Sequence, residues 1–98
     1  MTSASLQFLG LVKKAGALIY GDALIDAIRS HSVYLVLLSD RASDRTRKQL
    51  KDKCAFYQVP VFDDVPSEVF ADIKGKTVAA FGINNPKMAS KILRDEKR

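Results

Sequence analysis

The longest apolar run of the chain covers residues 33–38, which read VYLVLL. β-branched and aromatic side chains are frequent in it, and the polar residues Ser39 and Asp40 end it. An unbroken apolar run of this length is typical of a strand that is buried on both faces, because a strand with one face in water alternates apolar and polar residues. We therefore predict a central, buried strand over residues 33–38.

A helix is predicted directly after this strand, because apolar residues recur there at helical spacing on a strongly basic background. Its apolar positions are Leu50, Cys54 and Tyr57. Ser43 or Asp44 can cap its first turn by accepting from free backbone N–H groups, Pro60 ends it, and Val61 and Phe62 open another strand. These elements form a βαβ unit, whose right-handed crossover is expected to place the two strands parallel in one sheet.

The rest of the chain also alternates helices and strands. Further helices are expected from Ser3 or Ser5 to Gly16, from the cap Asp22 to Arg29, from Pro66 and Ser67 to Ile73, and from Asn84 or Asn85 to a charged tail at residues 94–98; further strands are expected at residues 18–20 and 77–83. The last strand is rich in small residues, as if another element packs closely on it. Such alternation places helices on both faces of a largely parallel or mixed sheet. The predicted fold class is α/β, a three-layer α/β/α sandwich with a four-stranded mixed sheet.

The composition fits one such domain over residues 1–98. A chain of 98 residues with 47% hydrophobic content can form one core but hardly two. No apolar run approaches the roughly 20 residues of a membrane span, and the first 16 residues lack the pattern of a signal peptide. Cys54 is the only cysteine, which excludes an intramolecular disulfide and suits a reducing compartment. The predicted location is cytoplasmic, without contact with a membrane.

The formal net charge of +5 is unevenly distributed along the chain. Residues 41–53 hold six basic and two acidic side chains, whereas residues 63–74 hold four acidic side chains and one lysine. A basic face attracts phosphates with sequence-independent, salt-sensitive affinity, but such faces also serve simply to keep proteins in solution. Charge alone therefore leaves nucleic-acid binding and a solubilising surface as equal alternatives.

Few residues could carry out catalysis. His31, the only imidazole, lies in a polar turn without an obvious partner, so we interpret it as a turn residue and not as a catalytic base. Cys54 lies on the apolar side of its helix and is interpreted as a buried small hydrophobe. The glycines form no phosphate-binding pattern. Asp40 could be a phosphoacceptor or a metal ligand, but a loop-capping role is favoured because no second acidic residue lies beside it.

Short segments over nearly the whole chain share the pattern of a known family. They are Gly10 and Leu11, residues 14–16, Gly21 and Asp22, residues 27–30 and 35–40, Ala42 and Ser43, Thr46 and Lys48, and the most specific part, residues 52–54 with Tyr57, Val59 and Pro60. In these segments the chain resembles the kink-turn-binding ribosomal-protein family, in its small bacterial YlxQ-like branch. The family's fold, an α/β/α sandwich with a four-stranded mixed sheet, agrees with the fold predicted above.

The resemblance implies an RNA-binding module without enzymatic activity, cofactor or metal, which grips a sharply bent RNA helix at three neighbouring places. Here these places are Gly21 and Asp22, residues 40–42, and residues 65–69. The partners implied are structured RNA, ribosomal or other kink-turn RNA, and ribosomal proteins, but not DNA. Together with flanking polar and basic side chains, the predicted RNA-binding residues are Lys13, Lys14, Gly21, Asp22, Asp40, Arg41, Ala42, Ser43, Arg45, Lys48, Val65, Pro66 and Ser67.

Five positions depart from the family pattern, and they leave alternative functions open. Asp26 stands where RNA-binding members carry a lysine, and Ala17, Arg41, Pro66 and Glu68 also differ. An aspartate repels phosphate where a lysine attracts it. One hypothesis is an RNA-binding protein of the translation apparatus; another is a protein-interaction adaptor that has kept the fold and lost kink-turn binding. A third is a receiver-like or small-ligand domain that uses Asp40 at the end of its strand.

Overall fold

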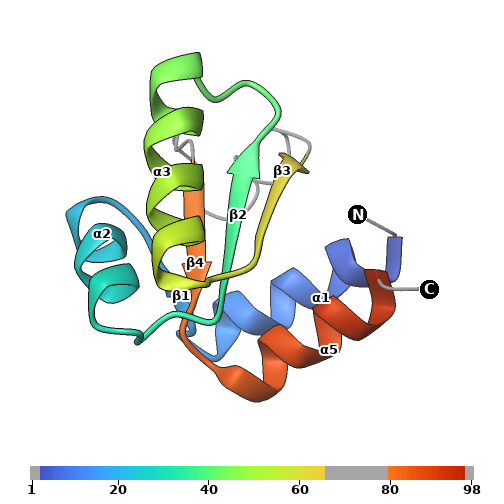
Figure 1. Ribbon diagram of the computed structural model, residues 1–98. Helices are drawn as coiled ribbons and strands as arrows, with labels where there is room; N and C mark the ends of the chain where they lie inside the picture. Colours follow the sequence, from blue (N-terminus) through green and yellow to red (C-terminus); the bar gives the residue numbers. More distant parts are fainter. Residues whose placement is uncertain (1–2, 66–79, 97–98) are drawn as a thin grey trace.

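The computed structural model describes residues 3–65 and 80–96 of the chain (Figure 1). Its elements are α1 (Ser3–Lys14), β1 (Leu18–Ile19), α2 (Asp22–Arg29), β2 (Leu35–Ser39), α3 (Asp44–Tyr57), β3 (Val61–Val65), β4 (Ala80–Ile83) and α5 (Pro86–Glu96). Within these ranges no helix is both long and apolar enough to cross a membrane. The helix predicted from Pro66 and the first residues of the strand predicted at 77–83 lie outside the described residues.

The four strands form one sheet in the order β1-β4-β2-β3. β2 and β3 are parallel, as predicted for the βαβ unit, whereas β4 is antiparallel to both β1 and β2. The sheet is therefore mixed. Because β1 and β2 are both antiparallel to β4, the strands β1, β2 and β3 all run in the same direction, toward one edge of the sheet. This edge, where Gly21, Asp40 and Val65 lie, is termed the C-terminal edge below.

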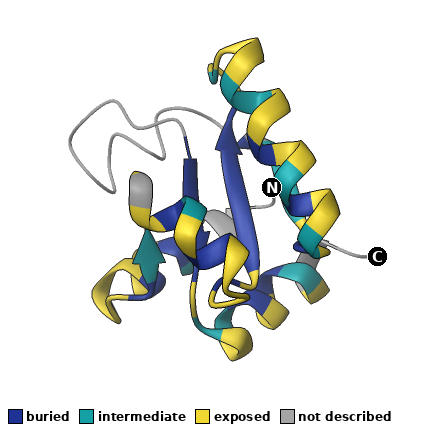
Figure 2. Ribbon diagram, turned by 60° about the vertical axis from the view of Figure 1, so that its left-hand side comes forward, coloured by how far each residue is buried: buried dark blue, intermediate teal, exposed yellow. Residues whose placement is uncertain are grey.

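Helices cover both faces of the sheet (Figure 1). One cluster of buried side chains joins α1 and α5 to one face and includes Leu9, Val12, Leu35, Leu37, Phe81, Ile83 and Ile92. A second cluster joins α2 and α3 to the other face and includes Leu24, Ile28, Val36, Leu38, Leu50 and Cys54. Successive side chains of β2 alternate between the two clusters, so the strand is buried along its whole length (Figure 2). The predicted three-layer α/β/α sandwich is confirmed.

The buried strand differs from the prediction at both ends. β2 begins at Leu35, two residues later than expected, and Tyr34 is 41% exposed. At the other end the strand includes Ser39, which is only 3% exposed. A polar residue can be buried here because its oxygens are satisfied: Ser39 Oγ accepts from the Arg41 amide at 3.1 Å, and the Ser39 carbonyl accepts from the Ala42 amide at 3.1 Å.

Two of the predicted helix caps are confirmed. Ser43 Oγ accepts a hydrogen bond from the Thr46 amide at 3.2 Å and caps α3. Asn85 Oδ1 accepts from the Met88 amide at 3.1 Å at the start of α5, and Pro86 occupies the first helical position, where its missing N–H costs no helical hydrogen bond. The starts of α3 and α5 are thus fixed by side chains that the sequence identifies.

Three other boundaries are corrected. The cap predicted at Asp22 is wrong, because Gly21 is the N-cap and Asp22 is already the first residue of α2. Gly21 has φ 68° and ψ −147°, a conformation open almost only to glycine. Because the chain turns at Gly21, the helix begins one residue earlier than predicted. β3 continues past Phe62 to Val65, since it pairs with the end of β2. α5 continues to Glu96, so the predicted charged tail begins inside the helix.

A glycine of β4 allows α2 to pack closely on the sheet, as the small residues of this strand predict. A Cβ atom on Gly82 would lie 2.5 Å from Leu24 Cδ1 and 2.5 Å from Val33 Cγ2. These separations are far below van der Waals contact, so a side chain at this position would force Leu24 and Val33 to shift. Gly82 therefore helps to set the position of α2, whose first turn lies in the candidate site.

Cys54 provides a test of this core. It is 1% exposed, and burial raises the pKa of its thiol to about 11, so the thiol stays protonated at neutral pH. The interpretation as a buried small hydrophobe is confirmed. We expect thiol reagents to label the native protein slowly, and Cys54→Ser to lower the free energy of unfolding by roughly 1–3 kcal/mol, because a hydroxyl replaces an apolar contact.

Labelling rates with a chromogenic disulfide reagent and urea unfolding curves measure the two effects. Ala55→Ser is the matched control, because Ala55 is the exposed neighbour on the same helix and the change should stay within about 0.5 kcal/mol. Rapid labelling of the native protein, together with an unchanged stability of Cys54→Ser, would contradict the packing of α3 described above.

Candidate nucleic-acid interface

The C-terminal edge brings together three chain segments that are distant in sequence. β2 ends there before residues 40–43, β3 ends there at Val65, and β1, which runs in the same direction, is followed by Gly21. Val65 pairs with Ser39, so β2 and β3 end at the same level. Ile19 is level with Val36, three residues before Ser39, because both lie opposite Gly82, so β1 ends short of this level and Gly21 follows two residues later. Of the predicted RNA-binding residues, those at this edge are Gly21, Asp22, Asp40, Arg41, Ala42, Ser43, Arg45, Lys48 and Val65; Pro66 and Ser67 are outside the described residues.

Two predicted residues, Lys13 and Lys14, lie elsewhere. They occupy the last turn of α1, which leads into the start of β1 at the opposite edge. Leu18, the first residue of β1, is level with Leu35 through their shared partner Ile83. Along the strand direction, Leu18 is therefore about 16 Å from Asp40, which is the length of five residues of extended chain. These lysines are therefore far from the loop that follows β2, because α1 ends just before β1 and β1 begins at the opposite edge.

The first turn of α2, which follows Gly21, begins without a side-chain cap. Gly21 has no side chain to cap the helix, and no side-chain cap hydrogen bond is formed there. The Gly21 carbonyl accepts from the Leu24 amide at 3.1 Å, so the turn itself is fixed. The first N–H groups of a helix have no acceptor within the helix itself, and such groups attract anionic or carbonyl oxygens of a ligand.

The loop of residues 40–43, termed the 40–43 loop, is held by hydrogen bonds from its own backbone. The Asp40 amide donates to the Val65 carbonyl at 2.8 Å, which ties the loop to the end of β3. The next two amides, those of Arg41 and Ala42, donate to the side chain and carbonyl of Ser39. Each of these three N–H groups thus has an acceptor within the protein, and the loop conformation is fixed before any ligand arrives.

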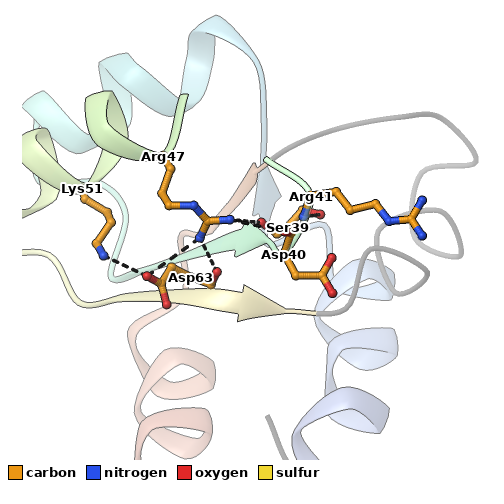
Figure 3. A network of polar contacts seen from close by, with 6 residues as sticks. All are labelled: Ser39, Asp40, Arg41, Arg47, Lys51 and Asp63. Carbon is orange, nitrogen blue, oxygen red and sulfur yellow. Dashed lines mark hydrogen bonds and ion pairs between the residues drawn. The ribbon is translucent and has the colours of Figure 1, made fainter. Parts of the chain in front are cut away.

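A guanidinium group joins α3 to this loop (Figure 3). Arg47 Nη2 donates to the carbonyls of Ser39 at 3.3 Å and Asp40 at 3.4 Å, and Nη1 donates to the Asp63 carbonyl at 2.5 Å. The Asp63 carboxylate also lies 3.8 Å from Arg47 Nη1 and 2.8 Å from Lys51 Nζ. The hydrogen bond from Lys51, ahead of weaker charge effects, lowers the pKa of Asp63.

This network separates two groups of cations in α3 and in the 40–43 loop before it. Arg47 and Lys51 face β3 and balance Asp63, so the acidic segment after α3 is partly neutralised by the basic helix. Arg47 was not among the predicted site residues. The signal that could have found it is present in the sequence: basic residues four apart on one face of a helix, followed by an aspartate on the strand that packs beside it.

The second group, Arg41, Arg45 and Lys48, lies outside this network. Arg41, Arg45 and Lys48 are exposed, and none of them forms an ion pair with the residues that the structure describes. In Figure 3 the Arg41 side chain extends away from the Arg47 network, and the Asp40 carboxylate also points outward. The C-terminal edge therefore offers three free cations beside a fixed loop and an uncapped helix start, an arrangement suited to phosphates and base edges.

Comparisons with known proteins agree with the fold and with the resemblance seen in the sequence. No family model matches the chain. It is 34% identical to the RNA-binding protein YlxQ of Enterococcus faecium over 88 residues, which cover 89% of this chain and 85% of that protein. It is 43% identical to the RNA-binding protein YlxQ of Bacillus subtilis (strain 168) over 53 residues, which cover 53% of each chain.

A solved structure has the same architecture. It is described as a protein with unknown function from Bacillus halodurans C, and it superimposes with a TM-score of 0.86 at 29% sequence identity. The superposition covers 95% of this chain and 96% of that chain, so all three layers correspond. On its similarity in sequence to the Enterococcus faecium protein over most of both lengths, the chain belongs to the family of the YlxQ proteins.

Proposed function

We propose that this protein binds structured, kink-turn-like RNA through its C-terminal edge, as a non-enzymatic protein of the translation apparatus. The observation that carries the proposal is the convergence of the uncapped start of α2 and the 40–43 loop at one edge of the sheet. The RNA-binding names of its relatives support RNA as the ligand. In this role its partners are ribosomal or other kink-turn RNA and ribosomal proteins in the cytoplasm, and DNA is not among them.

The physical roles of the parts follow from their chemistry. Arg41, Arg45 and Lys48 supply charge for phosphates, which contributes affinity but no sequence preference. The first N–H groups of α2 and the rigid 40–43 loop supply donors and contacts at fixed positions. Fixed contacts of this kind favour an RNA whose bases and phosphates are already displaced by a sharp bend, because a regular duplex hides its base edges in a deep, narrow groove.

The salt dependence of binding tests this proposal. We expect a fluorescently labelled kink-turn RNA to bind more tightly than an unbent duplex of the same length, with an affinity that falls by about 0.7–0.9 log units per log of salt for each phosphate contact. Arg45→Ala and Lys48→Ala should each weaken binding and lower the salt slope by about one such contact. Fluorescence anisotropy at two salt concentrations gives both quantities.

Lys87→Ala is the matched control, since Lys87 is an exposed lysine in the first turn of α5, at the opposite edge of the sheet. It should leave affinity and slope unchanged. Lys13→Ala and Lys14→Ala report whether the RNA also reaches that edge. Equal weak affinity for both RNAs would contradict kink-turn recognition, and no affinity for either RNA would contradict the proposal as a whole and favour the adaptor hypothesis.

Asp26 gives a second test, because its carboxylate opposes phosphate binding. It is exposed on α2, one helical turn after the start of that helix. Asp26→Lys replaces a repulsion by an attraction, so affinity for kink-turn RNA should rise about tenfold if the change contributes on the order of 1.4 kcal/mol. The salt slope should become steeper at the same time.

Asp52→Lys is the control for this charge reversal. Asp52 is also exposed, but it lies in the third turn of α3, away from the 40–43 loop. Both variants change the net charge by the same amount. A larger gain in affinity for Asp26→Lys would therefore come from the place of the charge on α2 and not from the total charge. An equal gain in affinity from Asp52→Lys would mean that RNA senses total charge, and the proposed place of α2 in the interface would be wrong.

A further inference from the structure

We propose that Arg47 is a positioning residue for the RNA site: it fixes the turn between Ser39 and Ala42 and thereby aims Arg41 at the RNA without touching the RNA itself. The part of this inference that concerns RNA rests on the function proposed above. The part that concerns the loop rests on contacts within the free protein and can be tested separately.

The guanidinium of Arg47 meets three strand-end groups at once. Its Nη2 lies between two consecutive carbonyls, those of Ser39 and Asp40, where the chain leaves β2. Its Nη1 contacts the carbonyl and carboxylate of Asp63 on β3. The planar, forked arrangement of N–H donors in arginine permits this set of contacts, whereas a lysine ammonium is a single point charge. One side chain therefore joins α3, β2 and β3 where the 40–43 loop begins.

The position of Arg41 depends on the same atoms. The Arg41 amide donates to Ser39 Oγ, and the Ala42 amide donates to the Ser39 carbonyl that also accepts from Arg47. The direction of this carbonyl sets the direction of the turn. Since the Arg41 side chain leaves the turn on the side away from Arg47 (Figure 3), a shift of the Ser39 and Asp40 carbonyls would redirect the Arg41 guanidinium.

Arg47 differs from the cations that are proposed to contact phosphate. Its side chain is 25% exposed, and its donors face inward toward backbone carbonyls. A contact with phosphate would require it to release these carbonyls, and leaving a part-buried carbonyl without a donor costs free energy. The helix thus carries two types of cation, and Arg47 acts on RNA through the loop.

Lys51 is a matched control on the same face of α3. It shares Asp63 with Arg47 through a 2.8 Å ion pair, but among the described residues it has no hydrogen bond to the Ser39 or Asp40 carbonyl. Lys51→Ala removes one positive charge and the contact with Asp63. Arg47→Ala removes one positive charge, the contact between Arg47 and Asp63, and the hydrogen bonds to the Ser39 and Asp40 carbonyls. Arg47→Lys keeps the charge and loses the forked contacts.

Two measurements separate positioning from charge. Amide hydrogen exchange, followed by NMR on the free protein, reports whether the Ala42 N–H opens more often. Anisotropy titrations with kink-turn RNA report affinity, and urea unfolding shows that each variant is folded. We expect Arg47→Ala and Arg47→Lys each to speed exchange at Ala42 about tenfold or more and to weaken RNA binding about tenfold, the effect of one lost hydrogen bond to a charged group.

Lys51→Ala should change both quantities by less than about twofold, because an exposed ion pair contributes little. Exchange at Ala42 that is unchanged in Arg47→Lys would overturn the inference, and Arg47→Lys decides alone if Arg47→Ala does not fold. Binding kept in Arg47→Lys and lost in Arg47→Ala would assign Arg47 a charge role and also overturn it. If the wild-type protein binds no RNA, the proposed function fails, and the exchange data still decide whether Arg47 fixes the loop.

Discussion

The burial of β2 between two layers of helices is the constraint on which the arrangement of the molecule depends. All five residues of this strand are buried, and its side chains alternate between the two hydrophobic clusters. A strand enclosed in this way must satisfy its backbone through neighbouring strands, and it does so with β3 on one side and β4 on the other. Its faces are therefore closed to ligands, and only its ends can meet solvent.

The same constraint explains why the polar chemistry collects at one edge. Three strands have a common direction, so the segments that follow them lead toward the same edge although they are far apart in sequence. Glycine at two positions makes this possible: Gly82 lets α2 approach the sheet, and Gly21 turns the chain directly into α2. The cations of α3 and of the loop before it then have two different surroundings, with Arg47 and Lys51 against β3, and Arg41, Arg45 and Lys48 in solvent.

The fold could be predicted from the sequence because hydrophobic patterning reports burial directly. The run at residues 33–38 identifies the central strand, and Leu50 with Cys54 identifies the face of α3 that packs on it. The pattern is weaker at strand ends, where Ser39 is buried through hydrogen bonds that no periodicity reveals. The grouping of site residues was harder still. Lys13 and Lys14 are positively charged, as Arg45 and Lys48 are, but charge does not indicate which edge of the sheet a residue occupies. Only the strand order decides the edge.

The most direct test of the account is a map of the RNA on the protein. Amide chemical shifts of the protein, labelled with nitrogen-15, would be followed during titration with an unlabelled kink-turn RNA. We expect the largest changes at Gly21, Asp22 and residues 40–43, with small changes at the opposite edge around Lys87. Changes that concentrate on α1 and the start of α5, with residues 40–43 unaffected, would contradict the placement of the interface at the C-terminal edge.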